Sequence, residues 1–202
     1  MRFIYTLFTI FAMLVFTGCT KEEKEETPRV KEYTTVEQSS YTINDISSGA
    51  KYILKRKNGA FVVEGHEEKI VMFDMYGTFC PPCQKEAPHL TNLQIKYLDK
   101  FIIIALNIFE EVDDSYIDNQ FRDGYGAFYF ISNSKHNKII VNTLLKDIGY
   151  KIPMQLPFKV VLQDAKYQKL TDIYNNNPDN NFYLGAISTN VIEKDLIRIF
   201  EN

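Results

Sequence analysis

Short apolar runs and alternating patterns mark the strands that this chain is expected to form. Residues 51–57 and 60–64 flank Asn58-Gly59, a dipeptide that readily adopts two positive φ angles and so favours a tight hairpin. The nearly continuous apolar runs at residues 70–73 and 101–108 are typical of strands that are buried on both faces. We therefore predict an N-terminal β-hairpin extension that is followed by two central strands.

Apolar residues with helical spacing lie between these two central runs. Leu90 and Leu93 recur at helical intervals after Cys83, which predicts a helix that ends at about residue 99 with a kink at Pro88. A strand, a helix and a second strand in this order imply a right-handed crossover between parallel strands. The pattern therefore favours an α/β fold.

The C-terminal half of the chain continues the alternation of helices and strands. The predicted helices cover residues 113–122 and 136–148 and a final segment through Ile192 and Ile199. An aromatic strand is predicted over residues 127–132. Two further strands, predicted over 158–162 and 169–174, form an antiparallel hairpin around a polar turn at 164–168.

Composition narrows the class of protein. The 202 residues are 45% hydrophobic and include only 9 Gly and 7 Pro, as expected for one globular domain and not for a disordered or repetitive chain. The 23 Lys and Arg against 26 Asp and Glu give a net charge of −3. No basic surface large enough to bind nucleic acid is therefore expected.

The N-terminus has the features of an export signal. Met1-Arg2 precedes an apolar run that ends at Phe16 and is shorter than the ~20 residues of a membrane-spanning helix. Thr17-Gly18-Cys19 follows and resembles the bacterial lipobox, which implies a lipid on Cys19; the alternative is a soluble secreted protein with a chance cysteine. The expected organisation is a signal peptide over 1–18, a charged flexible tether over 19–40 and a folded domain over 41–202.

Two cysteines stand where the first central strand passes into the predicted helix, as Cys80-Pro81-Pro82-Cys83. Unpaired N–H groups and the helix dipole favour an anion there, so Cys80 is expected to be an accessible thiolate with a lowered pKa and Cys83 a buried thiol. Two sulfurs at this spacing can form and resolve disulfides. Half a zinc site and a structural disulfide are the alternatives, but there is no second cysteine pair and the three His are scattered, so no metal is expected.

The segment from Cys80 to Pro88 resembles the Cys-Pro-Pro-Cys-x-x-Glu-x-Pro motif of the thioredoxin-like superfamily. Within that superfamily it is similar to the membrane-tethered periplasmic reductases of the TlpA, ResA and CcmG type. The resemblance covers roughly residues 41–200 and implies a thioredoxin fold, with a central mixed sheet flanked by helices. Phe79 stands where the family has Trp, which implies an aromatic ring beside Cys80 on the substrate side.

Three further positions acquire roles from the resemblance. Asp74, six residues before Cys80, matches a buried acid that helps to move the proton of the second cysteine. Burial would raise its pKa, and a solvated Asp at the strand end is the alternative. Pro157 resembles the family's cis-proline, with the backbone of Leu156 presented to the substrate, and Pro153 is the competing candidate.

Two further parts of the chain lie outside the motif but near the expected site. The position of the thioredoxin lysine on the neighbouring strand is held by Ala105, so the partner of Asp74 is expected to be missing or different. Glu110-Glu111 follow a predicted strand near the active-site edge of the sheet. We interpret them as a solvated loop pair.

Together these residues predict an enzyme, a lipid-anchored thiol:disulfide oxidoreductase that faces the periplasm. The expected site consists of the catalytic Cys80, Cys83 and Asp74 and the substrate-binding Phe79, Leu156 and Pro157. The resemblance implies protein disulfides as substrates, among them apocytochrome c, a membrane reductant as a partner, and no cofactor beyond the Cys80–Cys83 disulfide. The alternatives are a disulfide-forming oxidase with the same dithiol and a non-enzymatic metal- or protein-binding module.

Overall fold

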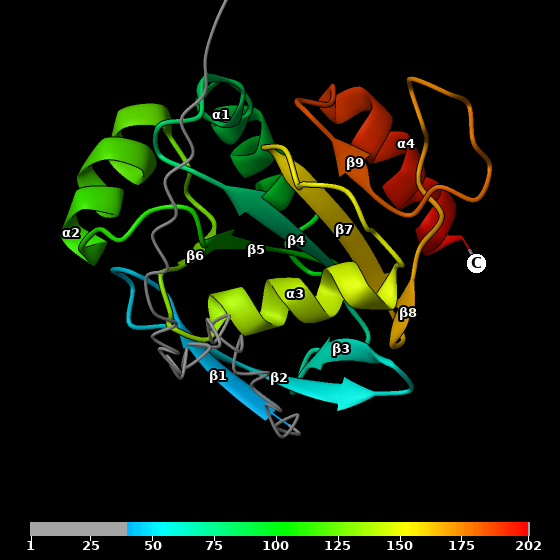
Figure 1. Cartoon of the computed structure of the whole chain (residues 1–202), viewed down its shortest axis with the longest axis horizontal. Helices are drawn as coiled ribbons and strands as arrows, with labels where there is room; N and C mark the ends of the chain where they lie inside the picture. Colours follow the sequence, from blue (N-terminus) through cyan, green and yellow to red (C-terminus); the bar gives the residue numbers. More distant parts are fainter. Residues whose placement is uncertain (1–39, 202) are drawn as a thin grey trace, which may run out of the picture. The chain divides into compact units, whose positions relative to one another are not determined.

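The computed structural model describes residues 40–201, whose centre is a mixed sheet of six strands (Figure 1). Parallel strands lie in the order β6-β5-β4, and β7 runs antiparallel to β4 on the other side. Two short strands, β8 and β9, pair with the far edge of β7. The strands are β4 (Ile70–Tyr76), β5 (Phe101–Asn107), β6 (Phe130–Ser132), β7 (Phe158–Gln163), β8 (Lys166–Tyr167) and β9 (Tyr183–Leu184).

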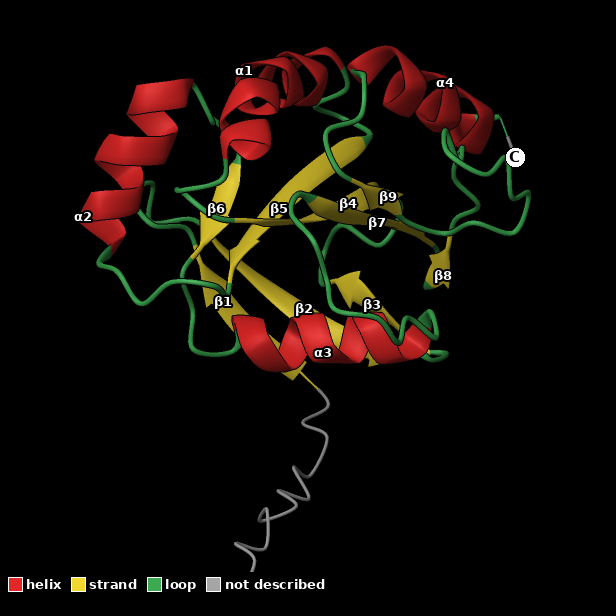
Figure 2. Ribbon diagram, turned by 45° about the horizontal axis from the view of Figure 1, so that its top comes forward, coloured by secondary structure: helices red, strands yellow, loops and turns green. Residues whose placement is uncertain are grey.

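Helices cover both faces of this sheet. Helices α1 and α4 pack on one face, and α3 packs on the other (Figure 2). The helices are α1 (Pro81–Lys96), α2 (Asp114–Ile117), a π-helical turn (Asp118–Asp123), α3 (Asn137–Asp147) and α4 (Thr189–Phe200). The predicted α/β class with a central mixed sheet is confirmed.

The alternation of side chains along β4 creates two separate apolar cores. Met72 and Tyr76 face α1 and α4, and Phe73 and Met75 face α3. Every residue of β4 and β5 is buried, because a sheet that is covered on both sides leaves no strand face for water. Cys80 and Cys83, which follow β4, belong to the same core as Met72 and Tyr76.

A second, three-stranded antiparallel sheet packs on the same face as α3. The predicted hairpin is present as β2 (Lys51–Lys57) and β3 (Ala60–Val63), joined by Asn58 and Gly59 with positive φ angles. The strand β1 (Ser40–Asn44) pairs with β2 and was not predicted.

Some predicted boundaries were wrong. The predicted strand over 169–174 is not a strand, because the hairpin closes tightly at Asp164 and Ala165, both with positive φ, and its return strand is β8. Leu170 then turns away from β7 and donates its backbone N–H to Asn180. The predicted helix over 113–122 is divided between α2 and the π-helical turn, and the strand over 127–132 shortens to β6.

Candidate active site

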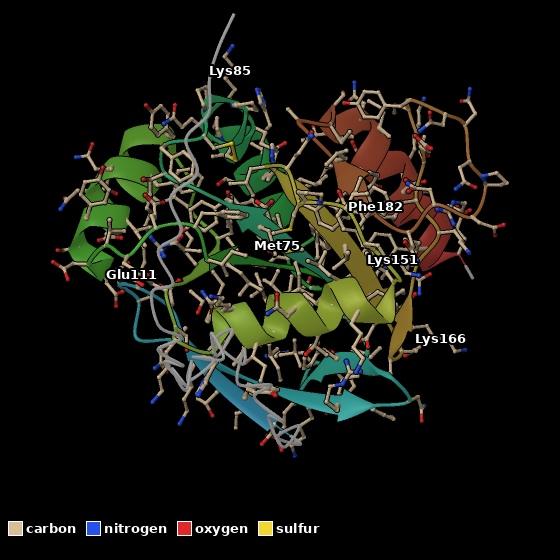
Figure 3. The ribbon with its side chains drawn as sticks, viewed as in Figure 1. Met75, Lys85, Glu111, Lys151, Lys166 and Phe182 are labelled. Atoms are coloured by element: carbon tan, nitrogen blue, oxygen red, sulfur yellow. A yellow bond between two sulfur atoms is a disulfide. The ribbon has the colours of Figure 1, made fainter. Side chains whose placement is uncertain are left out.

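Cys80 and Cys83 form a disulfide at the N-terminus of α1 (Figure 3). Cys80 is the N-cap residue, and its Sγ accepts the backbone N–H of Cys83 at 3.3 Å. Pro81 and Pro82 occupy the first two helical positions, where a backbone N–H would have no partner within the helix. The local sequence therefore starts the helix and directs the backbone N–H of Cys83 at the first sulfur.

The two cysteines differ little in exposure in this disulfide-bonded form. Cys80 is 5% exposed and Cys83 is 2% exposed. The expectation that Cys80 is open to solvent is therefore not met here, because its sulfur is bonded to Cys83 and packs within the core beneath α1. The difference that we predicted applies to the reduced dithiol.

Phe79, immediately before the disulfide, is an exposed aromatic side chain. It is 58% exposed, and its ring lies against the backbone of Gly77. A Cβ at Gly77 would stand 2.7 Å from Cε1 of Phe79, closer than real Cβ contacts allow. Glycine at this position therefore leaves room for the Phe79 ring.

Leu156 and Pro157 lead directly into β7. The bond between them is cis, and it is the only cis peptide bond in residues 40–201. The carbonyl of Pro157 accepts the backbone N–H of Gly185 at 2.8 Å, which joins this segment to the end of β9. The half-buried side chain of Leu156 contacts both apolar cores. Pro153, the competing candidate, has a trans bond.

A buried group of three charged side chains lies in the core beneath the disulfide. Asp74 of β4 is 2% exposed, and its Oδ1 lies 3.2 Å from the Nζ of Lys159. Lys159 stands directly opposite Asp74 in β7 and also forms an ion pair with Glu86 of α1. Glu86 follows Cys83 by three residues, so the two side chains share the buried face of α1. We call Asp74, Lys159 and Glu86 the buried triad.

The charges of the buried triad do not balance if both carboxyl groups are ionised. Burial raises the pKa of Asp74, although the Lys159 ammonium acts in the opposite direction. Burial also raises the pKa of Glu86, to about 7. The pKa of Lys159 is raised, since the attraction of both carboxylates outweighs the effect of burial. Near neutral pH the triad therefore holds a proton that it can release or take up.

Sequence reasoning recognised Asp74 but missed its partners. Ala105 does lie beside Asp74 on β5, and the cation comes instead from β7 on the other side. The sequence did contain one indication, since Lys159 is the single charged residue among the apolar residues of 158–162. A lysine buried in such a strand needs a counter-ion. Glu86 was part of the quoted motif but received no role.

Glu110 is also part of the site, and its interpretation as a solvated residue was wrong. Its carboxylate accepts the backbone N–H of Thr78 at 2.6 Å and the Thr78 hydroxyl at 2.7 Å. Gln84 donates to the carbonyl of the same threonine at 2.6 Å. Glu111 is exposed, as expected. The loop that carries Phe79 and Cys80 is therefore held by the segment that follows β5 and by α1.

Cys19 lies outside the residues that the structure describes, as do the predicted signal peptide and nearly all of the predicted tether. Across residues 40–201, no helix has the length and apolar character needed to span a bilayer. Within the same residues, no group of three or more His, Cys, Asp or Glu side chains could hold a metal ion.

Sequence comparisons relate this chain to thioredoxin-like proteins and thiol-disulfide oxidoreductases. Residues 53–148 match the family model described as Thioredoxin. The thiol-disulfide oxidoreductase ResA of Bacillus thuringiensis (strain Al Hakam) is 33% identical over 105 residues, which cover 52% of this chain and 53% of ResA. The thioredoxin-like protein YneN of Bacillus subtilis (strain 168) is 24% identical over 140 residues, covering 69% of this chain and 81% of YneN. The match thus spans about half the length of ResA.

Solved structures share the fold of this chain. A thiol:disulfide interchange protein of the thioredoxin family from Chlorobium tepidum TLS superposes with a TM-score of 0.52 at 15% identity, covering 79% of this chain and 92% of that protein. A DsbF homologue from Corynebacterium diphtheriae gives a TM-score of 0.51 at 16% identity, covering 79% and 84%. At this level of sequence identity, the superpositions show a shared fold and no more.

Proposed function

We propose that the chain is a thiol:disulfide oxidoreductase that reduces protein disulfides through Cys80 and Cys83, because residues 53–148 match the Thioredoxin family model. The observation that carries the proposal is the disulfide at the start of α1, with a proton-holding triad on the buried side of the same helix. The first feature stabilises a thiolate and the second accepts a proton, and thiol–disulfide exchange needs both.

The reduction of one substrate disulfide proceeds in two exchange steps. The Cys80 thiolate attacks one sulfur of the substrate, the substrate S–S bond breaks, and the departing sulfur leaves as a thiolate that takes a proton from water. Cys83 then passes its proton to a carboxylate of the buried triad and attacks Cys80 as a thiolate. The mixed disulfide breaks, the second substrate thiol is released, and two electrons have passed from the dithiol to the substrate.

The buried triad is suited to the second step. Cys83 is buried, so water cannot readily remove its proton. Glu86 lies one helical turn away on the same face and has a pKa of about 7, close to the pH at which it must both accept and release a proton. Lys159 of β7 holds this carboxyl group in place and is itself paired with Asp74 of β4.

An insulin-reduction assay on the full chain tests this proposal. Reduced protein is expected to accelerate insulin precipitation in the presence of dithiothreitol. Cys80→Ser should abolish the acceleration, and Cys83→Ser should accumulate a mixed disulfide with insulin that mass spectrometry detects. Cys19→Ser, which leaves the proposed dithiol intact, is the matched control and should retain the wild-type rate. A Cys80→Ser protein with wild-type activity would disprove the assigned nucleophile.

The direction of the reaction depends on the reduction potential of the dithiol. We propose reduction because the motif from Cys80 to Pro88 resembles that of the membrane-tethered reductases of the TlpA, ResA and CcmG type. A potential near that of thioredoxin, about −270 mV, supports this, whereas one near −120 mV indicates an oxidase. Equilibration with glutathione or dithiothreitol buffers, read by thiol alkylation and mass, measures it.

We also propose that the protein is attached to a bacterial membrane through lipid on Cys19 and faces the periplasm, where a membrane reductant restores the dithiol. The lipobox-like Thr17-Gly18-Cys19 after an apolar run supports this. Apocytochrome c is a proposed substrate by resemblance alone. Membrane fractionation and mass spectrometry of the extracted protein test the anchor. An unmodified Cys19, or a chain of full length from Met1, would contradict it.

A further inference from the structure

At the edge of the sheet beside Pro157, a long loop separates two short strands that both pair with β7. Both β8 and β9 pair with the same edge of β7, yet residues 168–182 leave the sheet between them. We call this segment the β8–β9 loop. Leu170 and Asn180 close its base, since the Leu170 N–H donates to the Asn180 carbonyl at 2.8 Å and the Asn180 amide donates back to the Leu170 carbonyl at 3.3 Å.

The β8–β9 loop is ordered by its own hydrogen bonds and still exposes apolar side chains. Asp172 accepts the backbone N–H groups of Tyr174 and Asn175 at 2.9 and 3.0 Å. The side chains of Ile173 and Tyr174 nevertheless remain 46% and 63% exposed. Ile152, in the segment that leads from α3 to Pro157, is 63% exposed. Single exposed apolar residues are ordinary, but these three border one cavity.

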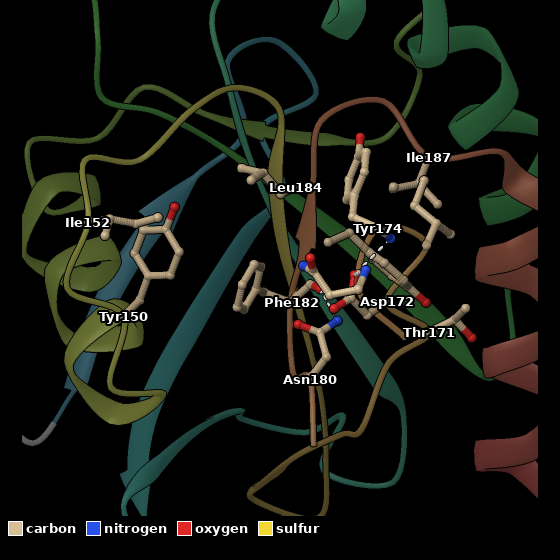
Figure 4. Close-up of a pocket in the computed structure, with 12 residues that line it drawn as sticks. Tyr150, Ile152, Thr171, Asp172, Tyr174, Asn180, Phe182, Leu184 and Ile187 are labelled. Carbon is tan, nitrogen blue, oxygen red and sulfur yellow. Dashed lines mark hydrogen bonds between the residues drawn. The ribbon is translucent and has the colours of Figure 1, made fainter. Parts of the chain in front are cut away.

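The cavity has a volume of about 180 Å³ and mostly apolar walls (Figure 4). Its walls come from the segment before Pro157 and from the β8–β9 loop with β9, and include Tyr150, Ile152, Tyr174, Phe182, Leu184 and Ile187. The polar atoms of Asp172 and Asn180 are taken up by the loop's own hydrogen bonds. Sites for cofactors and drug-sized ligands usually measure about 300–1,000 Å³, so this cavity suits one large apolar side chain.

Two backbone contacts link segments that line the cavity to residues of the proposed redox site. Its Leu184 wall is followed by Gly185, whose N–H donates to Pro157, and the Tyr174 hydroxyl lies 3.2 Å from where a Cβ on Gly185 would stand. On its inner side, the backbone of Ile187 lies near the Glu86 carboxylate and lowers its pKa. Leu184, in the wall of the cavity, is therefore one residue away from the backbone that contacts Pro157.

We propose that this cavity binds an apolar side chain of the substrate polypeptide, close in sequence to the cysteine that Cys80 attacks. The inference rests on the proposed function and adds a preference to it: the favoured substrate is an extended, unfolded segment with Leu, Phe or a similar residue near its cysteine. Ile152 and Tyr174 are the specificity-determining residues, because they form the exposed rim of the cavity.

Peptides that contain one cysteine in a disulfide with glutathione test the proposal. A Gly/Ser host peptide carries Leu, Phe or Ser at each position within three residues of the cysteine, and the rate at which reduced full-length protein releases the peptide thiol is followed by chromatography. At one position Leu or Phe should raise the rate constant about tenfold over Ser, as burial of one such side chain provides.

Two rim variants and a matched control locate the effect. Ile152→Ser and Tyr174→Ser should lose most of the preference and keep the wild-type rate with the all-Ser peptide. The control is Ile95→Ser, near the C-terminal end of α1, because Ile95 is as exposed as Ile152, 64% against 63%. This variant should retain the full preference for Leu or Phe.

Four results would overturn the inference. Equal rates for all peptides, or a preference that both rim variants retain, would refute the role of the cavity while leaving the proposed activity intact. A dimer in analytical ultracentrifugation that Ile152→Ser dissociates would assign the rim to a second copy of the chain. Protein that leaves even the all-Ser peptide oxidised would refute the proposed function, and the inference with it.

Discussion

Replacing Glu86 with glutamine should change how the stability of the oxidised protein depends on pH. The pKa of Glu86 is raised from 4.5 to about 7, chiefly by burial, so the folded state binds this proton more tightly than the unfolded chain. Stability therefore falls as pH rises from about 4.5 to 7, because only the folded state must deprotonate a buried group over that range. A glutamine side chain cannot titrate, so the Glu86→Gln variant should lose this part of the pH dependence.

The size of the effect follows from the two pKa values. A difference between about 7 and 4.5 is worth about 3 kcal/mol, at about 1.4 kcal/mol for each pH unit. With a urea m-value of about 2 kcal/mol per molar, the unfolding midpoint of the wild type should fall by about 1.5 M between pH 4.5 and pH 8. Glu86→Gln leaves Asp74 to neutralise Lys159, so the variant should still fold.

Urea unfolding measured by far-UV circular dichroism provides the assay, since the chain has no Trp for fluorescence. Wild type, Glu86→Gln and the control Glu111→Gln, which alters an exposed acid, are compared from pH 4.5 to 8 without reductant. The control should keep the wild-type slope. Parallel profiles for wild type and Glu86→Gln would refute the assignment of the raised pKa to Glu86.

Three further changes test other contacts. Lys159→Met leaves two buried carboxyl groups without their cation and should lower the free energy of unfolding by about 3–5 kcal/mol; adding Glu86→Gln should recover part of this, and no recovery would argue against the pairing. Glu110→Ala removes both hydrogen bonds to Thr78 and should cost about 2 kcal/mol in urea unfolding; an unchanged midpoint would contradict it. Gly77→Ala displaces the adjacent aromatic ring at a cost below about 1 kcal/mol and should slow peptide reduction; an unaltered rate would show that the ring's position is not used.

Features with a local cause could be predicted from the sequence. The run from Ile70 to Phe73 is apolar because both of its faces are covered, and that pattern is visible without any knowledge of the partners. The disulfide at Cys80 and Cys83 depends on four consecutive residues and on the helix that they start. The chemistry of the dithiol could therefore be inferred before the fold was known.

Contacts across long sequence separations could not be predicted in the same way. Lys159 reaches Glu86 across 73 residues, and only the register of β7 against β4 places it beside Asp74. The same limitation explains Glu110, which is separated from Thr78 by 32 residues. The pattern within one segment shows that a charged residue is unusual there, but it does not show which distant residue forms the ion pair with it.

The β8–β9 loop illustrates a different limit. The apolar residues between Lys169 and Tyr174 resemble a strand edge, and pairing with β7 was the simplest expectation. In the structure the Leu170 side chain enters the core while its backbone bonds to Asn180 instead of to the sheet. Competition between two backbone partners of similar strength is decided by tertiary packing, which the local pattern does not contain.

The position of Lys159 in β7 also bears on how the chain avoids misfolding. Its neighbours Phe158 and Val160 face the other core, so a slip of β7 by one residue would turn the ammonium into an entirely apolar layer. A slip by two residues would keep the correct face but place the ammonium opposite Met72 or Tyr76 rather than Asp74. Either error would leave the lysine and the two acids buried without partners, which would destabilise the folded state by several kcal/mol. The same three charges to which we assign proton transfer therefore also favour a single alignment of β7 against β4.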